Sequence, residues 1–271
     1  MTTQHTPPYL THSDFAPPHI AYGFFTRHGG VSQGGYASLN GGYGSGDSKA
    51  HIATNRQLAT TALQLTHLVG LRQIHSAEVH TITPDNLNHP PTHTPPTLTG
   101  DGLVTNLAEI GLVILTADCA PVLFADPTHN IIGAAHAGWR GAVAGVTDQT
   151  IHAMCGLGAT PATITAIIGP AIQRPSYQVG EDMRETVLAK DPTALPYFHP
   201  DNNAHNKPKG KYQFDLPAYI SHRLKTLAIA HYALPHDTMA DPSRFFSHRH
   251  STLAGTANQA GRLINIIALK P

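Results

Sequence analysis

Short apolar runs separated by turn residues dominate the middle of the chain. Four of them follow one another closely. Runs of this length, rich in Val, Ile and Leu and bounded by Gly, Asp and Asn, are typical of strands. Their close spacing predicts neighbouring strands rather than strands that alternate with helices. The four predicted strands are "GLVTN" (102–106), "GLVILTAD" (111–118), "APVLFAD" (120–126) and "NIIGAAHAG" (130–138).

Helical periodicity marks the segments on either side of these strands. Apolar residues recur three and four positions apart, with N-cap or C-cap residues at the ends. The pattern predicts helices at 48–65, 139–158, 180–190 and 214–229, and further strands from Ile20, at 67–83, 162–172 and 261–269. This irregular mixture predicts an α+β fold in which helices pack outside strand layers.

The domain organisation follows from the proline-rich and polar segments. Residues 1–18 contain four prolines and are expected to form a flexible N-terminal lead-in, followed by a single domain at 19–271. Residues 85–102 are expected to form a surface loop, and 191–213 a polar excursion. No internal repeat is present.

Composition and charge exclude several classes of protein. Charged residues make up 13% of the chain, and 17 Lys and Arg balance 17 Asp and Glu. This balance argues against nucleic-acid and membrane partners. Two cysteines form no disulfide framework, and no signal peptide or spanning segment is evident, so a soluble, cytoplasmic protein is expected. The oligomeric state stays open.

Three side chains lie at or near the ends of apolar strands, where they can converge. They are His75, Cys119 and His136. One thiolate and two imidazoles are ligands that suit zinc and leave a fourth position open. Their separations of 44 and 17 residues match no zinc-finger pattern, so a Cys–His nucleophilic pair and structural packing remain alternatives. Asp118, adjacent to Cys119, is either a general base or orienting group, or a turn residue.

Other segments carry groups that can bind an anion. The glycine-rich "TRHGGVSQGGYASLNGG" (26–42) offers backbone N–H groups beside Arg27, but matches no nucleotide-binding motif. Arg140 and Arg249 are further candidates for phosphate contacts, with a salt bridge as the alternative for Arg249. Cys155 is expected to be a packing residue.

Seven segments in order resemble the YfiH family, also called the laccase-domain, polyphenol oxidase or purine nucleoside phosphorylase family. They span about residues 20–269. The segments are "FFTRHGGVSQGGYASLN", "RQIHSAEV", "DGLVTN", "TADCAPVLFAD", "AAHAGWRG", "IGPAI" with "YQVG", and "FFSHR".

The resemblance implies a four-layer α/β/β/α fold of two mixed sheets flanked by helices. It also implies a Zn²⁺ site made by His75, Cys119 and His136. Asp118, next to Cys119, is then expected to relay a proton as a further catalytic residue. Substrate and phosphate contacts are expected from Arg27, Asn40, Gln73, Arg140 and Arg249.

The implied activity is phosphorolysis of adenosine, inosine, guanosine and S-methyl-5'-thioadenosine, with deamination of adenosine. The alternatives are a copper-dependent (Cu²⁺) polyphenol oxidase and a metal-free Cys–His hydrolase or amidase acting on cell-wall precursors. The chain departs from the family pattern at Ser176 and Asp237, where many members carry cysteine.

Overall fold

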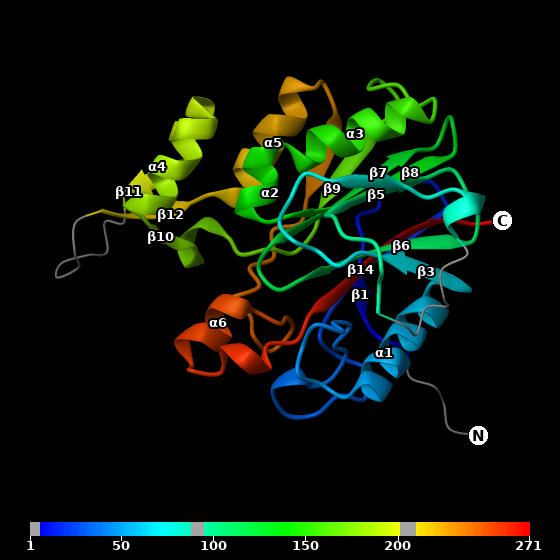
Figure 1. Ribbon diagram of the computed structural model, residues 1–271, viewed down its shortest axis with the longest axis horizontal. Coiled ribbons are helices and arrows are strands. Elements are labelled where there is room, and N and C mark those ends of the chain that lie inside the picture. The colour runs from blue at the N-terminus through cyan, green and yellow to red at the C-terminus, as the bar shows by residue number, and fades with distance from the viewer. Residues whose placement is uncertain (1–5, 88–94, 201–209) are drawn as a thin grey trace.

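The computed structural model describes residues 6–87, 95–200 and 210–271. It confirms two large mixed sheets flanked by helices (Figure 1). The larger sheet has six strands in the order β13-β9-β7-β8-β5-β4. These strands are β4 (Val79–Thr81), β5 (Gly102–Thr105), β7 (Ala120–Asp126), β8 (Ile131–Ala137), β9 (Thr165–Ile168) and β13 (Ala230–Ala233).

The second sheet has five strands in the order β1-β2-β14-β6-β3. The C-terminal strand β14 lies at its centre and pairs antiparallel with both β2 and β6. These strands are β1 (Tyr9–Leu10), β2 (Ile20–Phe25), β3 (His67–Gly70), β6 (Ile110–Thr116) and β14 (Leu263–Leu269).

Helices cover the outer face of each sheet. In Figure 1, α2, α3 and α5 lie above the six-stranded sheet and α1 lies below the five-stranded sheet. Within the described residues the α-helices are α1 (Lys49–Ala62), α2 (Trp139–Ala144), α3 (Val146–Gly156), α4 (Glu181–Lys190), α5 (Leu216–Thr226) and α6 (His248–Leu253). No helix within the described ranges is long and apolar enough to cross a membrane.

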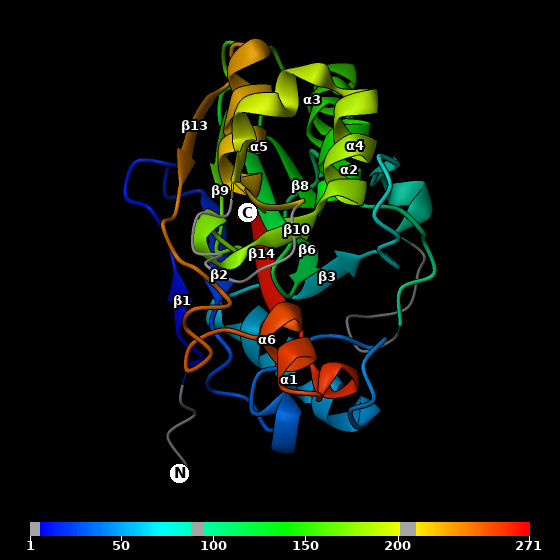
Figure 2. The ribbon, with the colours of Figure 1, turned by 90° about the vertical axis from the view of Figure 1, so that its left-hand side faces the viewer.

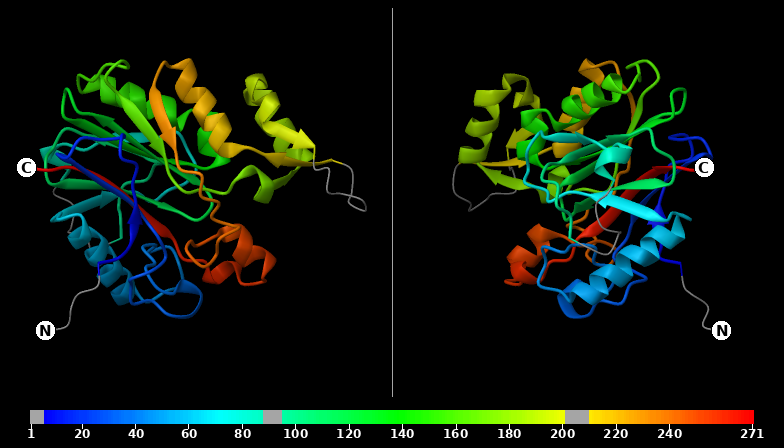
Figure 3. Two further views of the ribbon diagram at one scale, coloured as in Figure 1. Left: turned by 180° about the vertical axis from the view of Figure 1, so that it is seen from behind. Right: turned by 45° about the vertical axis from the view of Figure 1, so that its right-hand side comes forward.

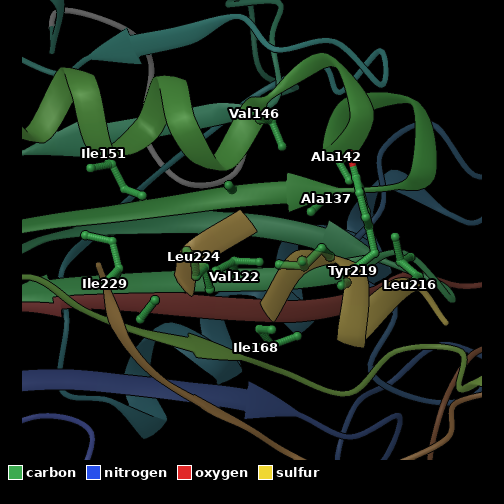
Figure 4. Close-up of a cluster of buried hydrophobic side chains, with 14 of the residues drawn as sticks. Val122, Ala137, Ala142, Val146, Ile151, Ile168, Leu216, Tyr219, Leu224 and Ile229 are labelled. Carbon is green, nitrogen blue, oxygen red and sulfur yellow. The ribbon is translucent and has the colours of Figure 1, made fainter. Parts of the chain in front are cut away.

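The strands are apolar on both faces because both faces are buried. Successive side chains of a strand point to opposite faces. On β7, Val122 and Phe124 join the core beneath the helices, whereas Leu123 joins the core between the two sheets. Figure 4 shows the first of these cores, where Val122 and Ile168 lie near Leu224 and Ile229. This alternation produces the predicted α/β/β/α order of layers.

A small third sheet projects from one end of the molecule beside α4 (Figure 3). It has the order β10-β12-β11 and is antiparallel throughout. The small sheet consists of β10 (Gln178–Gly180), β11 (Phe198–Pro200) and β12 (Lys211–Phe214).

Figure 2 shows α6 on the same side as α1, opposite to α2, α3 and α5.

Several predicted elements differ from the structure for local reasons. The helix predicted at 139–158 is two helices, because Gly145 has a φ of +89° and breaks the first. The strand predicted at 67–83 is two strands in different sheets, β3 and β4. The polar excursion at 191–213 contains β11 and β12, and residues 201–209 lie outside the described residues.

The two remaining loop predictions fall partly on described residues. Within the expected flexible lead-in, Tyr9–Leu10 pair with β2 and Phe15 is buried, so this part packs against the domain; residues 1–5 lie outside the described ranges. The predicted loop at 85–102 ends where β5 begins at Gly102, and residues 88–94 are also outside those ranges.

Candidate metal centre and its cavity

Strand pairing brings Cys119 and His136 to the same edge of the six-stranded sheet. β7 and β8 are antiparallel neighbours, with Ala120 opposite Ala137 and Pro121 opposite His136. Cys119 comes immediately before β7, and His136 is the second-last residue of β8. The 17-residue separation is therefore the length of one hairpin that returns to its starting edge.

His75 reaches this edge from the connection between β3 and β4, which passes from one sheet to the other. Its φ is +62°, in the left-handed region that non-glycine residues rarely adopt. The backbone N–H of His75 donates to Asp101 Oδ1 at 3.0 Å. A carboxylate contact thus holds the histidine in an unfavourable backbone conformation that points it at the site.

The three side chains converge. One nitrogen from each of His75 and His136 and the sulfur of Cys119 lie within 4.8 Å of one another. Cys119 Sγ is 3.8 Å from His75 Nε2, and the two imidazole rings meet edge to face. His136 is buried, Cys119 is partly buried and His75 is exposed, so the centre opens to solvent on one side.

Gly138 provides the space for this convergence. A Cβ atom at this position would lie 2.8 Å from Cys119 Sγ and 2.9 Å from His75 Cδ2. Any larger residue would push one of these two side chains away.

Asp101 is a fully buried carboxylate that orients both histidines. His136 Nδ1 donates to its Oδ1 at 2.8 Å, which leaves His136 Nε2 to face Cys119 and His75. The backbone N–H and hydroxyl of Ser76 donate to Oδ2. Burial raises the pKa of Asp101, but these hydrogen bonds outweigh it and lower the pKa to about 2, so the group stays ionised.

The electrostatics of the centre favour a thiolate. Burial raises the pKa of Cys119, but the charge of His136 and hydrogen bonds from both histidines outweigh it and lower the pKa to about 6. Burial lowers the pKa of His136, but Cys119 and Asp101 outweigh it and raise it to about 9. Without a metal, the proton lies on the imidazole and the negative charge on sulfur.

This donor set fits zinc. A thiolate and two imidazoles are zinc ligands, three protein ligands leave a position open, and a carboxylate that binds the distal nitrogen of a ligating histidine is the usual second partner. Within the described part of the chain, His75, Cys119 and His136 form the one group of three or more such side chains close enough to share an ion.

The centre opens into a cavity of about 780 Å³ whose wall is rich in arginine. Among the described residues that line it, Asp118 is the one carboxylate. Five arginines against one carboxylate make the described part of the lining strongly positive. The five arginines are Arg56, Arg72, Arg140, Arg249 and Arg262.

Two of the residues expected to contact substrate lie away from the cavity wall. Arg27 donates to the carbonyls of Ala37 and Pro242 and stacks on Phe246, so it fastens the glycine-rich loop to a distant segment. Asn40 is buried, and its Oδ1 accepts from the backbone N–H groups of Gly42 and Arg262. Asn40 therefore supports the wall from behind, at two residues that line the cavity.

Gln73, Arg140, Arg249 and Asp118 do line the cavity. The amide of Gln73 bonds the backbone N–H and carbonyl of Leu115, so it fixes the wall. Arg140 stacks on Trp139, while Arg249 lies over Tyr177 and donates to a backbone carbonyl.

Asp118 is anchored at both oxygens. Oδ1 accepts from the Thr238 hydroxyl at 2.7 Å and Oδ2 from the backbone N–H of Arg249 at 2.6 Å. The two departures from the family pattern lie beside these contacts and are bonded to each other, because Ser176 Oγ donates to Asp237 Oδ2 at 2.6 Å. A hydrogen bond therefore joins the two chain segments at Ser176 and Asp237.

Sequence reasoning missed several residues of this site. Asp101 is part of an Asp-Gly pair before a strand, which is also a turn signal. Tyr43 is in a glycine-rich stretch, and Arg56 is in the middle of a helix, so neither position suggested a cavity. The strand-end position of Asp101, like those of Cys119 and His136, was the one available signal. The missed lining residues also include Arg72, Tyr177, His248 and Arg262.

Comparisons with known proteins agree with this architecture. A family model described as "Multi-copper polyphenol oxidoreductase laccase" matches residues 21–270. A Haemophilus influenzae protein named purine nucleoside phosphorylase is 35% identical over 244 residues, covering 89% of this chain and 91% of the relative. A Streptomyces coelicolor protein of the same name is 41% identical over 175 residues, covering 64% of this chain and 70% of the relative.

Two solved structures superpose on nearly the whole chain. A Neisseria meningitidis protein of the family DUF152 superposes with a TM-score of 0.83 at 32% identity, covering 97% of this chain and 99% of that one. Bacillus licheniformis YfiH superposes with a TM-score of 0.81 at 27% identity, covering 93% of each chain.

Proposed function

The chain belongs to the multi-copper polyphenol oxidoreductase laccase family, which includes the YfiH/DUF152 proteins, and on this premise we propose that it is a zinc-dependent purine nucleoside phosphorylase. The observation that carries the proposal is the convergence of His75, Cys119 and His136 in an arginine-rich cavity. The names of its relatives support the reaction. The substrates are phosphate with adenosine, inosine, guanosine or S-methyl-5'-thioadenosine.

Each residue of the centre has a defined part in this proposal. His75, Cys119 and His136 hold the zinc ion, and Asp101 keeps the Nε2 atom of His136 directed at it. Zinc bound by three protein ligands supplies Lewis acidity at its open position. Gly138 keeps the ligands close together.

The cavity suits a nucleoside and an anion together. Its volume of about 780 Å³ is in the range of sites for molecules of this size. Tyr177 and Trp139 offer aromatic faces to a purine, and the arginines supply the positive charge that phosphate requires. Since Cys119 is a ligand, it does not attack the substrate itself.

Deamination of adenosine in the same cavity is a second activity that we propose. It requires a group that accepts a proton from water and returns it to the leaving amine. Asp118 is the one lining carboxylate among the described residues, and its hydrogen bonds with Thr238 and Arg249 hold it in place.

The copper alternative has less support. Oxidation of phenols by several copper ions requires several imidazole-rich sites. The part of the chain that the structure describes contains one cluster of ligand side chains, with two histidines. We therefore propose zinc rather than copper.

One observation favours a second candidate, the metal-free Cys–His hydrolase. Asp101 bonds His136, and His136 in turn lowers the pKa of Cys119, as in an acid–imidazole–thiol triad. The two proposals differ in what metal removal does. A hydrolase that uses Cys119 as nucleophile keeps its activity without metal and forms a covalent adduct with its substrate.

The test is product analysis with adenosine and phosphate. The wild-type protein is expected to release adenine with consumption of phosphate, and inosine if it deaminates. Cys119→Ala should abolish both, whereas Cys155→Ala should leave both unchanged, because Cys155 packs at the end of α3 away from the cavity lining. Absence of both products in the zinc-loaded wild type would refute the proposal.

A further inference from the structure

The arginines of the cavity form two groups with different neighbours. Arg140 lies over Trp139 and Arg249 over Tyr177, and this group, with Ile172 and Leu216 of the same lining, is named here the Tyr177 end. Arg56 lies over Tyr43, and Arg262 is beside Gly42. This second group, named here the Tyr43 end, consists of Gly42, Tyr43, Ser45, Arg56 and Arg262.

The hydroxyl of Tyr43 is the key feature of the Tyr43 end. It is buried, and it is the one buried side-chain nitrogen or oxygen without a hydrogen-bond partner among the described residues. Buried polar groups are nearly always paired, because an unpaired one loses its hydrogen bonds with water and gains none in return. A hydroxyl unpaired in the wall of a cavity indicates a ligand that brings its own polar atom.

Positive charge surrounds this hydroxyl. The Arg56 guanidinium lies 5.6 Å from the centre of the Tyr43 ring, and the Arg56 side chain is buried. Arg262 adjoins the same loop, because its Cγ would be 2.7 Å from a Cβ atom at Gly42. Its charge also interacts with those of Cys119 and Asp118, so the guanidinium is near the metal centre as well. One of its nitrogens donates to the carbonyls of Ala260 and Gly261.

The chemistry of the Tyr43 end is that of hydrogen-bond donors. Burial raises the pKa of the Tyr43 hydroxyl, which therefore keeps its proton, and both arginines only donate. No carboxylate lines this end among the described residues: Asp47, on the same loop, is occupied by Ser32 and Asn40. Positively charged donors without a carboxylate match an oxyanion better than the mixed edge of a purine.

The Tyr177 end has the opposite character. The guanidinium of Arg140 lies 4.3 Å from the centre of the Trp139 ring, and that of Arg249 lies 5.4 Å from the centre of the Tyr177 ring. Flat aromatic and apolar surface of this kind suits a purine better than phosphate.

We propose that the Tyr43 end is the subsite for inorganic phosphate, with Tyr43, Arg56 and Arg262 as its donors, and that the nucleoside occupies the Tyr177 end. This assignment rests on the proposed phosphorylase function and replaces Arg140 and Arg249 as the phosphate partners. It places phosphate and nucleoside in different parts of the one cavity into which the His75–Cys119–His136 centre opens.

The test compares Tyr43→Phe with Tyr36→Phe in the zinc-loaded protein. Tyr36 is a matched control because it lies on the same loop, but its hydroxyl donates to the carbonyl of Asn258 outside the cavity lining. Binding of inorganic phosphate is measured by titration calorimetry without nucleoside. Tyr43→Phe is expected to weaken it about ten-fold or more, the effect of losing a hydrogen bond to a charged group, and Tyr36→Phe to leave it unchanged.

Two further readouts separate a ligand contact from a structural role. Tyr43→Phe should leave the melting temperature of the phosphate-free protein unchanged or raise it, because an unpaired hydroxyl is removed. In steady-state assays it should raise the KM for phosphate and leave the KM for the nucleoside unchanged. Unchanged phosphate binding in Tyr43→Phe, or equal weakening in Tyr36→Phe, would overturn the subsite.

The outcomes also distinguish this proposal from the proposed function. Phosphate binding that depends on Tyr43 in a protein without phosphorolysis would support the subsite and refute the phosphorylase. Phosphorolysis with the same KM for phosphate in Tyr43→Phe and the wild type would support the phosphorylase and refute the subsite.

Discussion

Two histidine–aspartate pairs occupy opposite ends of the β7–β8 hairpin. His136 is near the end of β8 and bonds Asp101, whereas His129 is in the turn between the two strands and bonds Asp126. In both pairs the Nδ1–carboxylate distance is 2.8 Å and the carboxylate is fully buried. Backbone N–H groups also donate to both carboxylates.

The pairs differ in what the second imidazole nitrogen meets. The His129 side chain is 36% exposed, and the carboxylate of Asp126 also bonds Thr163, so this pair closes a turn. The His136 side chain is 5% exposed and meets Cys119 and His75 at a cavity. A histidine–carboxylate pair alone therefore stabilises local structure, and the convergence of a thiol and a second histidine makes it a site.

The largest expected effect comes from removing each histidine. His136→Ala should abolish bound zinc and nucleoside phosphorolysis, because it deletes a ligand. His129→Ala should leave both intact and cost about 1 kcal/mol of unfolding free energy, the value of one hydrogen bond. Zinc analysis, product assays and chemical denaturation of both variants check this. Full zinc content in folded His136→Ala would contradict the assigned centre.

The second-largest effect is expected when the carboxylate of each pair is replaced by an amide. Asp101→Asn should weaken zinc binding about 10- to 100-fold, because this residue orients a ligating histidine. Asp126→Asn removes the same kind of buried group but should leave zinc affinity unchanged. Chelator competition measures the affinity, and thermal unfolding shows the loss of stability expected in both variants. Equal zinc affinities in the two variants would mean that Asp101 is only structural.

A smaller effect is expected at Gly138. In Gly138→Ala the added methyl group meets Cys119 Sγ and His75, and overpacking of this kind costs about 1–3 kcal/mol. Zinc affinity should therefore fall by up to about ten-fold. Gly156→Ala is the control, since a Cβ atom at Gly156 has no neighbour within 4 Å. If zinc binding were the same in both, the close packing around the ligands would have no role in the centre.

The smallest effect concerns pH and the metal-free protein. The lowered pKa of Cys119 adds stability that is lost as the pH falls toward 6, and the raised pKa of His136 adds stability that is lost as the pH rises toward 9. Between pH 6.5 and 9 the pair binds one proton in either state, on His136 when folded and on sulfur when unfolded. Its contribution to the unfolding free energy should thus be flat in this window.

Alkylation checks the same ionisation directly. The rate of Cys119 modification by iodoacetamide should titrate with a midpoint near pH 6, with Cys119→Ala giving the background from Cys155. A midpoint near pH 9 would show that His136 and His75 do not stabilise the thiolate.

The same contrast explains how much of the fold and of the site could be predicted from the sequence. The apolar strands at 111–118, 120–126 and 130–138 were predictable because burial on both faces leaves uninterrupted apolar runs. His75, Cys119 and His136 were identified because they interrupt or end such runs. Asp101 was missed, because its role depends on which strands become neighbours and not on its local sequence.

Long-range contacts also explain the remaining differences. Arg27 looks like an anion-binding residue beside a glycine-rich loop, but its partners include Pro242, more than 200 positions away. Tyr43 and Arg56 belong to a loop and a helix that join the cavity only after α1 packs on the five-stranded sheet. Strand β13 and helix α6 are short and polar, so periodicity did not indicate them.

The most direct test of the central claim is the metal content of the wild-type protein together with its dependence on that metal. The protein, purified without added metal, should contain about one zinc per chain by elemental analysis. Phosphorolysis of adenosine should disappear after chelation and return with zinc. Full activity in metal-free protein would contradict this account, as would activity restored by copper and not by zinc.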